Sequence, residues 1–502
     1  MQLRIYTLIL IFLTSTFILG CRKSENADAN TVVVAIGSKP STLDPRFATD
    51  AYGMRLTSLL FSSLVVLGPE LKIIGDVAEN WTYKNLIYTF QLKPNLTFSD
   101  GQKVTADDIL FSFDQFRDSK SPHNGSFSMI SKVEAKYDDG ERYVKIHLSS
   151  FSAALLNDLS TLKFLPRRLV EADDSGFSQN PIGSGPFKLV QSNPSDIILE
   201  ARPESGIAYK NLIFRVIADE NTRYLKMLKG EIDIAQNEIP SYKIFYIENR
   251  RKDLMVYKSP GLTMNYLLLN HQDPALKIRE VRMAIAHAIN RDEIITYKLD
   301  NLSTEATSIL SARNPYQLKG LKNPEYNPEK AKQLLAAAGF SGLSIALKTS
   351  NAQVAVENGK VLTNQLAKAG IQVRHQSFEW GTFFSDVSKG NFHVATMRWV
   401  GNFDPDIYRT FLHSKEVPPG RNRGRYSNPK LDQLLEEGLK IENEKKRIEH
   451  YKIVQAMVFE DMPFIPLWYD LDVAVVNPRI KNYKLSSTAD YRFALSISKA
   501  TK

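Results

Sequence analysis

The sequence contains few residue spacings that could support covalent catalysis. Ser160 and Lys163 form a Ser-x-x-Lys pattern, which carries the serine nucleophile of penicillin-binding enzymes, but the partner motifs Ser-Asp-Asn and Lys-Thr-Gly do not occur. Gly183-Ser184-Gly185-Pro186 is too short for a dinucleotide-binding loop, and its proline would block the helix that must follow. The sequence also lacks a phosphate-binding loop and a nucleophile elbow. We therefore expect no enzymatic activity, with an envelope enzyme of the Ser-x-x-Lys type as a disfavoured alternative.

The histidines and carboxylates are not grouped as metal ligands. The eight histidines are scattered, at positions 123, 147, 271, 287, 375, 393, 413 and 450. No two of them are three or four residues apart, and only one cysteine is present, so a structural zinc site is not expected. Paired carboxylates such as Asp107-Asp108 fall at expected helix starts, where capping explains them. We predict neither a metal site nor a cofactor.

The first 20 residues have the pattern of a secretory signal peptide. Arg4 precedes an apolar run over positions 8–19, which is short for a membrane-spanning helix. An N-terminal anchor helix is the alternative. The body of the chain is different, because no later run is apolar for long enough to cross a bilayer.

The run ends in Ile-Leu-Gly-Cys at positions 18–21, which resembles the lipobox of bacterial lipoproteins, although Ile18 and Leu19 depart from its usual leucine and small residue. Because Cys21 is the only cysteine, no internal disulfide can form. The resemblance implies lipidation at Cys21, with residues 21–30 as a tether. We therefore expect a lipid-anchored protein of the cell envelope that faces the periplasm or the cell exterior.

Length and composition indicate a soluble protein with more than one packed unit. The chain has 502 residues, of which 43% are hydrophobic and 24% charged, enough for two or three packed units. Its formal net charge of +9 is dispersed, and only residues 421–425 form a basic cluster, which is typical of a solvated loop. Without a zinc-finger spacing or a basic heptad region, we expect no nucleic-acid partner.

Strand-like and helix-like segments alternate along most of the chain, which predicts an α/β fold. β-Branched runs or alternating patterns predict strands at 31–36, 87–92, 143–148, 197–201 and 212–218. Thr105 and Asp108 form a capping box ahead of a helix, and Asn-Pro pairs begin two more helices at 327 and 428. Gly339 is expected to end the first of those two in the left-handed conformation. A further apolar stripe predicts a helix over 281–289.

Several blocks together resemble the extracellular solute-binding proteins, the family that includes oligopeptide- and dipeptide-binding lipoproteins. The blocks lie at 41–45 (STLDP), 59–113, 181–187 (PIGSGPF), 230–234 (GEIDI), 281–291, 327–339, 399–405 and 426–431. The resemblance covers roughly residues 31–470. It implies a two-lobed periplasmic-binding-protein fold of type II, with an extra subdomain on the first lobe. It also implies a monomer that captures an oligopeptide or dipeptide and delivers it to the permease and ATPase subunits of an ABC importer.

This resemblance divides the chain into discontinuous parts. After the signal peptide and tether, lobe one is expected from residues 31–50, 181–260 and 474–502, its extra subdomain from 51–180, and lobe two from 261–473. Neither low-complexity tracts nor internal repeats interrupt this plan.

The resemblance also implies a set of ligand-binding positions between the lobes. Two tryptophans would wall the side-chain pockets, polar residues after the Gly-Glu-Ile-Asp block would face the ligand, and extended backbone around the second tryptophan would pair with it. The positions are Thr49, Asp50, Ala51, Gln236, Asn237, Trp380, Arg398, Trp399, Val400 and Asp470.

One position departs from the pattern of the peptide binders. Their third residue after the second tryptophan is an aspartate that holds the peptide's ammonium group, whereas this chain has Asn402 there. A neutral amide cannot neutralise a buried ammonium. Either Asp404 serves instead, or the ligand lacks a free amino terminus. Murein fragments, metal chelates, haem-like molecules and opines therefore stay open as ligands, as does a role in sensing a peptide without transport.

Overall fold

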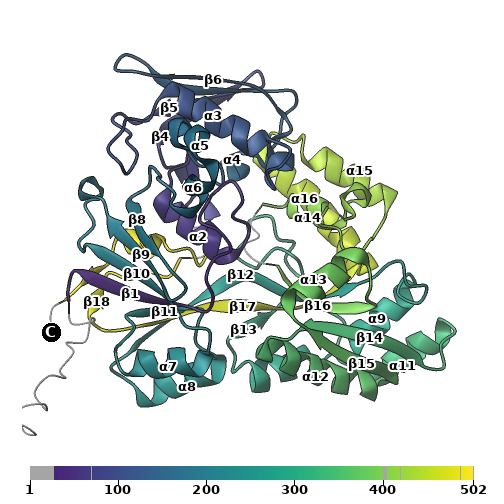
Figure 1. The fold of residues 1–502 in the computed structure, drawn as a ribbon. Coiled ribbons are helices and arrows are strands. Elements are labelled where there is room, and N and C mark those ends of the chain that lie inside the picture. The colour runs from purple at the N-terminus through teal and green to yellow at the C-terminus, as the bar shows by residue number, and fades with distance from the viewer. Residues whose placement is uncertain (1–27, 69–70, 400–403, 419, 487, 501–502) are drawn as a thin grey trace, which may run out of the picture.

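The computed structural model describes residues 28–68, 71–399, 404–418, 420–486 and 488–500, so Cys21, Val400 and Asn402 lie outside the described residues. Within them, a sheet of eleven strands runs through the middle of the molecule (Figure 1). Strand β13 (Ser303–Glu305) pairs with β17, off the main path of the sheet. The spatial order of the others is β15 (Ile371–Phe378), β14 (Leu343–Ser350), β16 (Val394–Trp399), β12 (Met255–Leu269), β17 (Phe464–Val476), β11 (Ile234–Gln236), β1 (Thr31–Ile36), β10 (Asn211–Val216), β9 (Asp196–Ala201) and β8 (Phe187–Ser192).

Two long strands, β12 and β17, join the two halves of this sheet. The sequence of β17, FIPLWYDLDVAVV, is rich in the branched and aromatic residues that suit a buried strand. The antiparallel register runs from Met255 and Val476 at one end to Leu268 and Phe464 at the other, with an irregularity at Pro260. Such irregularities locally bend a strand and increase its twist.

The halves have separate hydrophobic cores, and we call them lobe one and lobe two. Strand β17 contributes Ala474 and Val476 to the core of lobe one, and Ile465 and Leu467 to that of lobe two. The helices of lobe one include α2 (Ala51–Leu60), α7 (Glu220–Leu228) and α8 (Ser241–Arg250). Those of lobe two include α9 (Arg279–His287), α11 (Pro328–Ala337), α12 (Gln353–Lys368), α13 (Trp380–Lys389), α14 (Ile407–Leu412), α15 (Pro429–Gly438) and α16 (Glu444–Asp461).

A four-stranded antiparallel sheet lies above lobe one in Figure 1, and we call this region the extra subdomain. Its order is β4 (Ala78–Lys84), β5 (Ile87–Leu92), β7 (Arg142–Leu148) and β6 (Ile130–Tyr137). Helix α3 (Ala106–Arg117) buries Ile109 and Phe113 against it and begins at the predicted capping box, in which Thr105 and Asp108 exchange hydrogen bonds. These residues belong to the same hydrophobic core as lobe one, so the extra subdomain is built onto that lobe.

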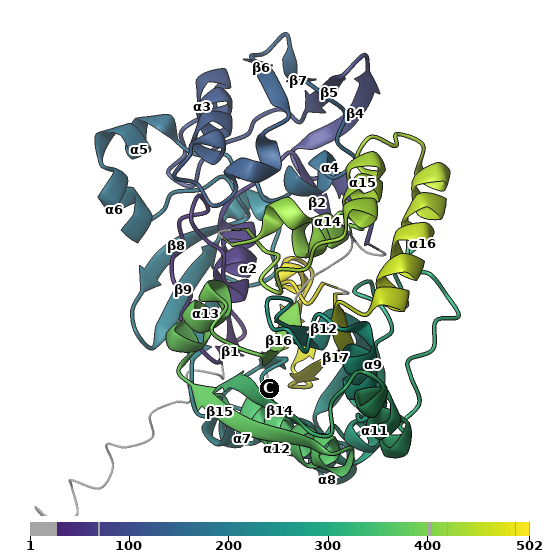
Figure 2. The same cartoon turned by 90° about the vertical axis from the view of Figure 1, so that its right-hand side faces the viewer.

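The extra subdomain also touches lobe two. The Ala153 N–H donates to the Leu439 carbonyl at 3.4 Å, and the Tyr83 hydroxyl donates to Glu442 Oε1 at 3.4 Å. Leu439 and Glu442 lie between α15 and α16, which stand beside the extra subdomain in both views (Figures 1 and 2). The two lobes are therefore in contact on this side of the molecule.

The strands and helices expected from the sequence are confirmed, with small shifts at their ends. The strand expected at 212–218 ends at Val216, because Asp219 already caps α7. Gly339 has a φ of 87°, as the left-handed stop after α11 requires. None of the described helices has both the length and the apolar composition needed to cross a bilayer. The division of the chain into residue ranges stays a prediction.

Candidate functional site

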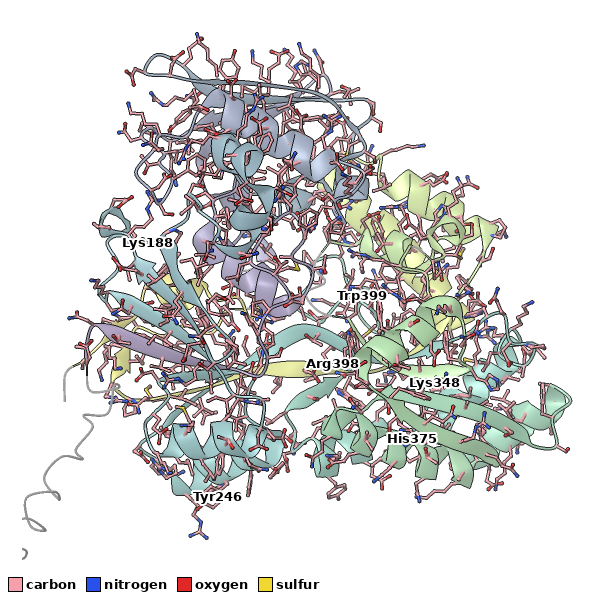
Figure 3. The ribbon with its side chains drawn as sticks, in the orientation of Figure 1. Lys188, Tyr246, Lys348, His375, Arg398 and Trp399 are labelled. Carbon is pink, nitrogen blue, oxygen red and sulfur yellow. The ribbon has the colours of Figure 1, made fainter. Side chains whose placement is uncertain are left out.

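Arg398 lies near the strands that join the two lobes (Figure 3), and it forms an ion pair with Asp470. Arg398 Nη2 on β16 donates to Asp470 Oδ2 on β17 at 2.6 Å, and Asn265 Nδ2 on β12 donates to Asp470 Oδ1 at 2.7 Å. The register explains this meeting, because Asn265 and Arg398 are direct partners in the antiparallel pair of β12 and β16. The side chain of Arg398 is 63% exposed and that of Asp470 is 28% exposed. Two residues predicted from the sequence are thus brought together.

A second polar pair joins Asn237 to Asp472, which lies two residues after Asp470 on β17. Asn237 has a left-handed φ of 60°, and its Nδ2 donates to Asp472 Oδ1 at 2.8 Å while its Oδ1 accepts from the Val473 N–H at 2.8 Å. Burial raises the pKa of Asp472 to about 6, although Asn237 and the nearby Arg55 oppose this. The charges of two neighbours also act on the pKa of Asp472, since Asp470 raises it and Arg398 lowers it. The predicted Asn237 therefore serves to hold a buried carboxylate at the junction.

A third group attaches α2 to the same region. The Tyr52 hydroxyl donates to Glu238 Oε1 at 2.6 Å, and the Arg223 Nε donates to the Glu238 carbonyl at 2.9 Å. Burial raises the pKa of Glu238, with Tyr52, Arg223 and Arg55 acting against it. Gly37 lies close to both side chains, since a Cβ on it would be 3.1 Å from Glu238 Oε2 and 3.2 Å from the Tyr52 hydroxyl. We call Arg55, Asn237, Glu238, Arg398, Asp470 and Asp472 the junction cluster.

The residues expected after the Leu-Asp-Pro block lie at the start of α2. Asp50 caps this helix by accepting from the Gly53 N–H at 2.9 Å, and it also accepts from the Ser41 hydroxyl at 2.6 Å. Thr49 and Ala51 on either side are exposed. The Asp50 carboxylate is thus used to fix the helix start, while its two neighbours are accessible.

Gln236 is buried, and its side chain faces the C-terminal segment of the chain. Its Nε2 donates to the Ala489 carbonyl at 2.7 Å and its Oε1 accepts from the Tyr483 hydroxyl at 2.7 Å. These contacts attach β11 to the residues that follow β17. The structure therefore does not bring Gln236 into the junction cluster.

The two predicted tryptophans lie on lobe two. Trp380 is the first residue of α13, is 56% exposed, and stacks on Phe384 at 5.5 Å between ring centroids. Trp399 ends β16 and packs on Phe411 at 5.1 Å. Trp380 offers an accessible aromatic face, and Trp399 is half-buried beside Arg398.

Asp404 is held by lobe two itself. Arg447 Nη2 and Nη1 donate to its two carboxylate oxygens at 2.8 and 3.1 Å. The Arg447 guanidinium is enclosed by the rings of Tyr316 and Tyr451, each 5.2 Å away. A carboxylate with this bidentate partner is already neutralised. The structure therefore gives no support to the prediction that Asp404 replaces the missing aspartate.

Carboxylates also gather where the extra subdomain meets lobe two. Asp158, the last residue of α4 (Leu155–Asp158), has its pKa raised well above the usual value by burial and by the charges of Asp404 and Asp406, against Arg409 and Arg421. Burial raises the pKa of Asp406 to about 6 despite its ion pair with Arg409 at 2.9 Å. Contact between the subdomain and lobe two therefore has an electrostatic cost that falls when these groups are protonated.

Sequence reasoning missed Arg55, Asp158, Glu238 and Asp472. The sequence of β17 could have indicated Asp472, because residues two apart on a strand share a face and Asp470 was already a candidate. The described residues hold no cluster of three or more His, Cys, Asp or Glu that could bind a metal ion. A hollow of about 620 Å³ lies elsewhere, between His271 and Asp461 of lobe two, and contains none of the predicted residues.

Known proteins share this architecture. Residues 72–417 match the model of the bacterial extracellular solute-binding proteins, family 5 (middle). The chain belongs to this family. Its relatives include the oligopeptide-binding protein AppA of Bacillus subtilis, 26% identical over 98% of this chain and 96% of that protein. The dipeptide-binding protein of Escherichia coli is 24% identical over 94% of this chain and 95% of its own length.

Solved structures of this kind have the same fold. NikZ from Campylobacter jejuni in complex with Ni(L-His) superposes with a TM-score of 0.83 at 25% identity, covering 94% of this chain and all of that one. AppA from Bacillus subtilis in complex with a nonapeptide superposes with a TM-score of 0.82 at 24% identity, covering 94% of this chain and 99% of that one. The expected two-lobed periplasmic-binding-protein fold is thereby confirmed. As a member of this family, the protein is a transport binding protein and not an enzyme.

Proposed function

We propose that this family 5 protein captures a short peptide between its lobes and delivers it to the permease of an ABC importer. The observation that carries the proposal is the junction cluster, whose exposed Arg398 and Asn237 lie beside the strands that connect the lobes in a chain that belongs to a solute-binding family. Relatives named for oligopeptide and dipeptide binding support the choice of ligand. Trp380, Trp399, Thr49 and Ala51 would then line the ligand.

Capture would work through a shift between open and closed arrangements of the lobes. A ligand favours closure only by binding the closed arrangement more tightly, so the residues that meet across the lobes set the energy difference. β12 and β17 are suited to be the hinge, because they are the long strands common to both cores. Closure would bury the ligand and create the surface that the permease recognises.

We further propose that the protein is exported and held at the membrane by lipid attached to Cys21. The apolar run over 8–19 and the ending at Cys21 support this. Stable anchoring takes more than one membrane-binding signal, as with two acyl chains. Residues 22–30 would then give the folded body freedom to reach the permease.

A thermal-shift screen tests the choice of ligand. A ligand present at 100 times its Kd stabilises the folded protein by about 2.7 kcal/mol, which raises the Tm measurably. We expect hits among di- to pentapeptides. A flat response across all peptides would contradict the peptide assignment.

A metal chelate is the second candidate ligand. The neutral Asn402 favours it, because a chelate needs no counter-charge for an ammonium group, and NikZ was solved with Ni(L-His). A Tm shift with nickel and L-histidine together, absent with either alone and absent with peptides, would support this alternative.

A further inference from the structure

We propose that the outer face of α8 binds the anionic surface of the membrane that carries the lipid anchor. This inference rests on the proposed lipid attachment at Cys21 and does not depend on which ligand is captured. Tyr242, Phe245 and Tyr246 of α8 are 53%, 62% and 49% exposed. Residues three and four positions apart share one side of a helix, and we call these three the aromatic face. A gathered group of exposed apolar side chains, unlike a single one, marks an interaction surface.

The aromatic face lies away from the candidate ligand site. Ile244 and Ile247, on the inner side of α8, are buried in a core of lobe one, which leaves the other side of the helix exposed. Figure 3 shows Tyr246 below the central sheet and Trp399 above it. Changes on the aromatic face should therefore leave the ligand site intact.

Exposed cations gather at the end of α8. Arg250 and Lys252 are exposed there, and Lys229 is exposed at the end of the neighbouring helix α7. Arg251 Nη1 donates to the Leu228 carbonyl at 3.1 Å, so the ends of the two helices meet. Among the described residues, none of the three exposed cations has a carboxylate partner. We call Lys229, Arg250 and Lys252 the basic end.

The acidic side chains around the basic end are already paired. The pairs are Glu231 with Lys226, Glu248 with Lys258 and Asp253 with Arg251. Acidic residues without such a role lie at the opposite end, where Glu220 and Glu357, together with burial, raise the pKa of Tyr242. The net charge near Phe245 and Tyr246 is therefore positive at the basic end, which suits an anionic surface.

The chain enters the fold at the same edge as the basic end. Strands β1 and β11 are parallel, with Val34 opposite Ile234, so both strands start at one edge of the sheet. Lys229 lies at that edge too, because only a short turn separates it from β11. Six residues, 22–27, lie between Cys21 and the first described residue. Even fully extended, that segment spans at most about 25 Å. A lipid on Cys21 would therefore keep this edge of lobe one close to the membrane.

The chemistry of this surface fits lipid headgroups. Tyrosine rings are enriched at membrane interfaces, and cations are attracted to anionic lipids. Each lysine or arginine near such a surface strengthens the contact by about fivefold. The contact is weak by itself, and the anchor makes it effective by raising the local concentration of membrane surface.

A fluorescent label on α8 tests the contact. Asn249 is exposed and follows Phe245 by one helical turn, so Asn249→Cys can carry a dye that reports apolar surroundings. An acylated Cys21 has no free thiol, so the dye attaches at one site. Lys188→Cys on β8 is the matched label position, because Figure 3 shows Lys188 and Tyr246 at opposite ends of lobe one. The full-length lipoprotein is reconstituted in vesicles of phosphatidylethanolamine and phosphatidylglycerol, or of phosphatidylcholine alone.

We expect a blue shift of the dye at position 249 on the anionic vesicles only, and none at position 188. Phe245→Ser should weaken the contact roughly 10-fold or more. Arg250→Gln combined with Lys252→Gln should weaken it about 25-fold. Ile453→Ser, which changes a 57% exposed residue of α16, is the matched control and should leave the shift unchanged. The Tm of each variant shows that it is folded.

The outcomes separate this inference from the proposed anchor. A missing shift at position 249, an equal shift at both positions, or an equal shift on both kinds of vesicle refutes the contact while the anchor stands. Mass spectrometry that finds no lipid on Cys21 refutes the anchor, and the inference fails with it. Light scattering that finds a dimer in detergent, dissociated by Phe245→Ser, assigns the aromatic face to a second copy of the chain and also refutes the membrane contact.

Discussion

Removing one partner of the Asp404–Arg447 pair should destabilise lobe two strongly. The Arg447 side chain is 4% exposed, and its Nη atoms lie 2.8 and 3.1 Å from the Asp404 oxygens. Asp404→Asn would leave this guanidinium buried without a counter-charge, which typically costs about 3–5 kcal/mol. We expect the lower end, about 3 kcal/mol, because Asp404 is 15% exposed and its removal relieves repulsion with Asp158 and Asp406.

Urea unfolding followed by tryptophan fluorescence measures this loss, since Trp380, Trp399 and Trp468 all belong to lobe two. Adding Arg447→Met to Asp404→Asn should recover part of the stability, because no unpaired charge then remains buried. The matched control is Glu134→Gln, which breaks the exposed pair with Lys132 and should leave the unfolding midpoint unchanged.

A loss below about 1 kcal/mol in Asp404→Asn, the scale of an exposed pair, would refute this reasoning. The same variant tests the role that the sequence suggested for Asp404. Since Arg447 already neutralises it, Asp404→Asn should not change the relative affinity for peptides with free and N-acetylated amino termini. A preference that disappears with the substitution would show that Asp404 contacts the ligand.

Three further predictions follow from other parts of the molecule. Burial and the charges of Asp404 and Asp406 across the contact with lobe two raise the pKa of Asp158, so this contact is favoured while Asp158 is protonated; ligand affinity should therefore fall as the pH rises through that raised pKa, and calorimetry should find this fall reduced in Asp158→Asn. Gly183→Ala should cost about 3 kcal/mol or more, because its Cβ would lie 2.0 Å from the Leu60 carbonyl oxygen; Gly342→Ala, with nothing within 4 Å, should not lower the Tm. Cys21→Ser should leave residues 1–20 attached and remove the lipid, and mass spectrometry showing a processed, lipidated variant would contradict the lipoprotein proposal.

Local signals in the sequence predicted the fold well. The capping box at Thr105 and the Asn-Pro helix starts depend on residues within four positions of one another, so their structure follows from short-range hydrogen bonds. The glycines of the PIGSGPF block are too closely spaced for a dinucleotide-binding loop, and the structure shows that they have a packing role. Gly183 and Gly185 allow the chain to pass directly against the end of α2, where a Cβ would collide with backbone.

The chemistry of the candidate site was harder to predict, because it depends on pairs far apart in the sequence. Arg447 lies 43 residues from Asp404, and nothing near either residue signals that they meet. The link between Arg398 and Asp470 depends on the register of three strands. The resemblance could indicate which positions lie between the lobes, and it could not indicate which of their polar groups are already occupied.

Native mass spectrometry of the protein purified from its own host tests the central claim most directly. If the protein captures a peptide between its lobes, the folded protein should carry an added mass that is released on unfolding and that sequencing identifies as a short peptide. A released ligand that contains no amino acids would contradict the account. A protein that stays at its own mass even after incubation with di- to pentapeptides would contradict capture of a peptide altogether.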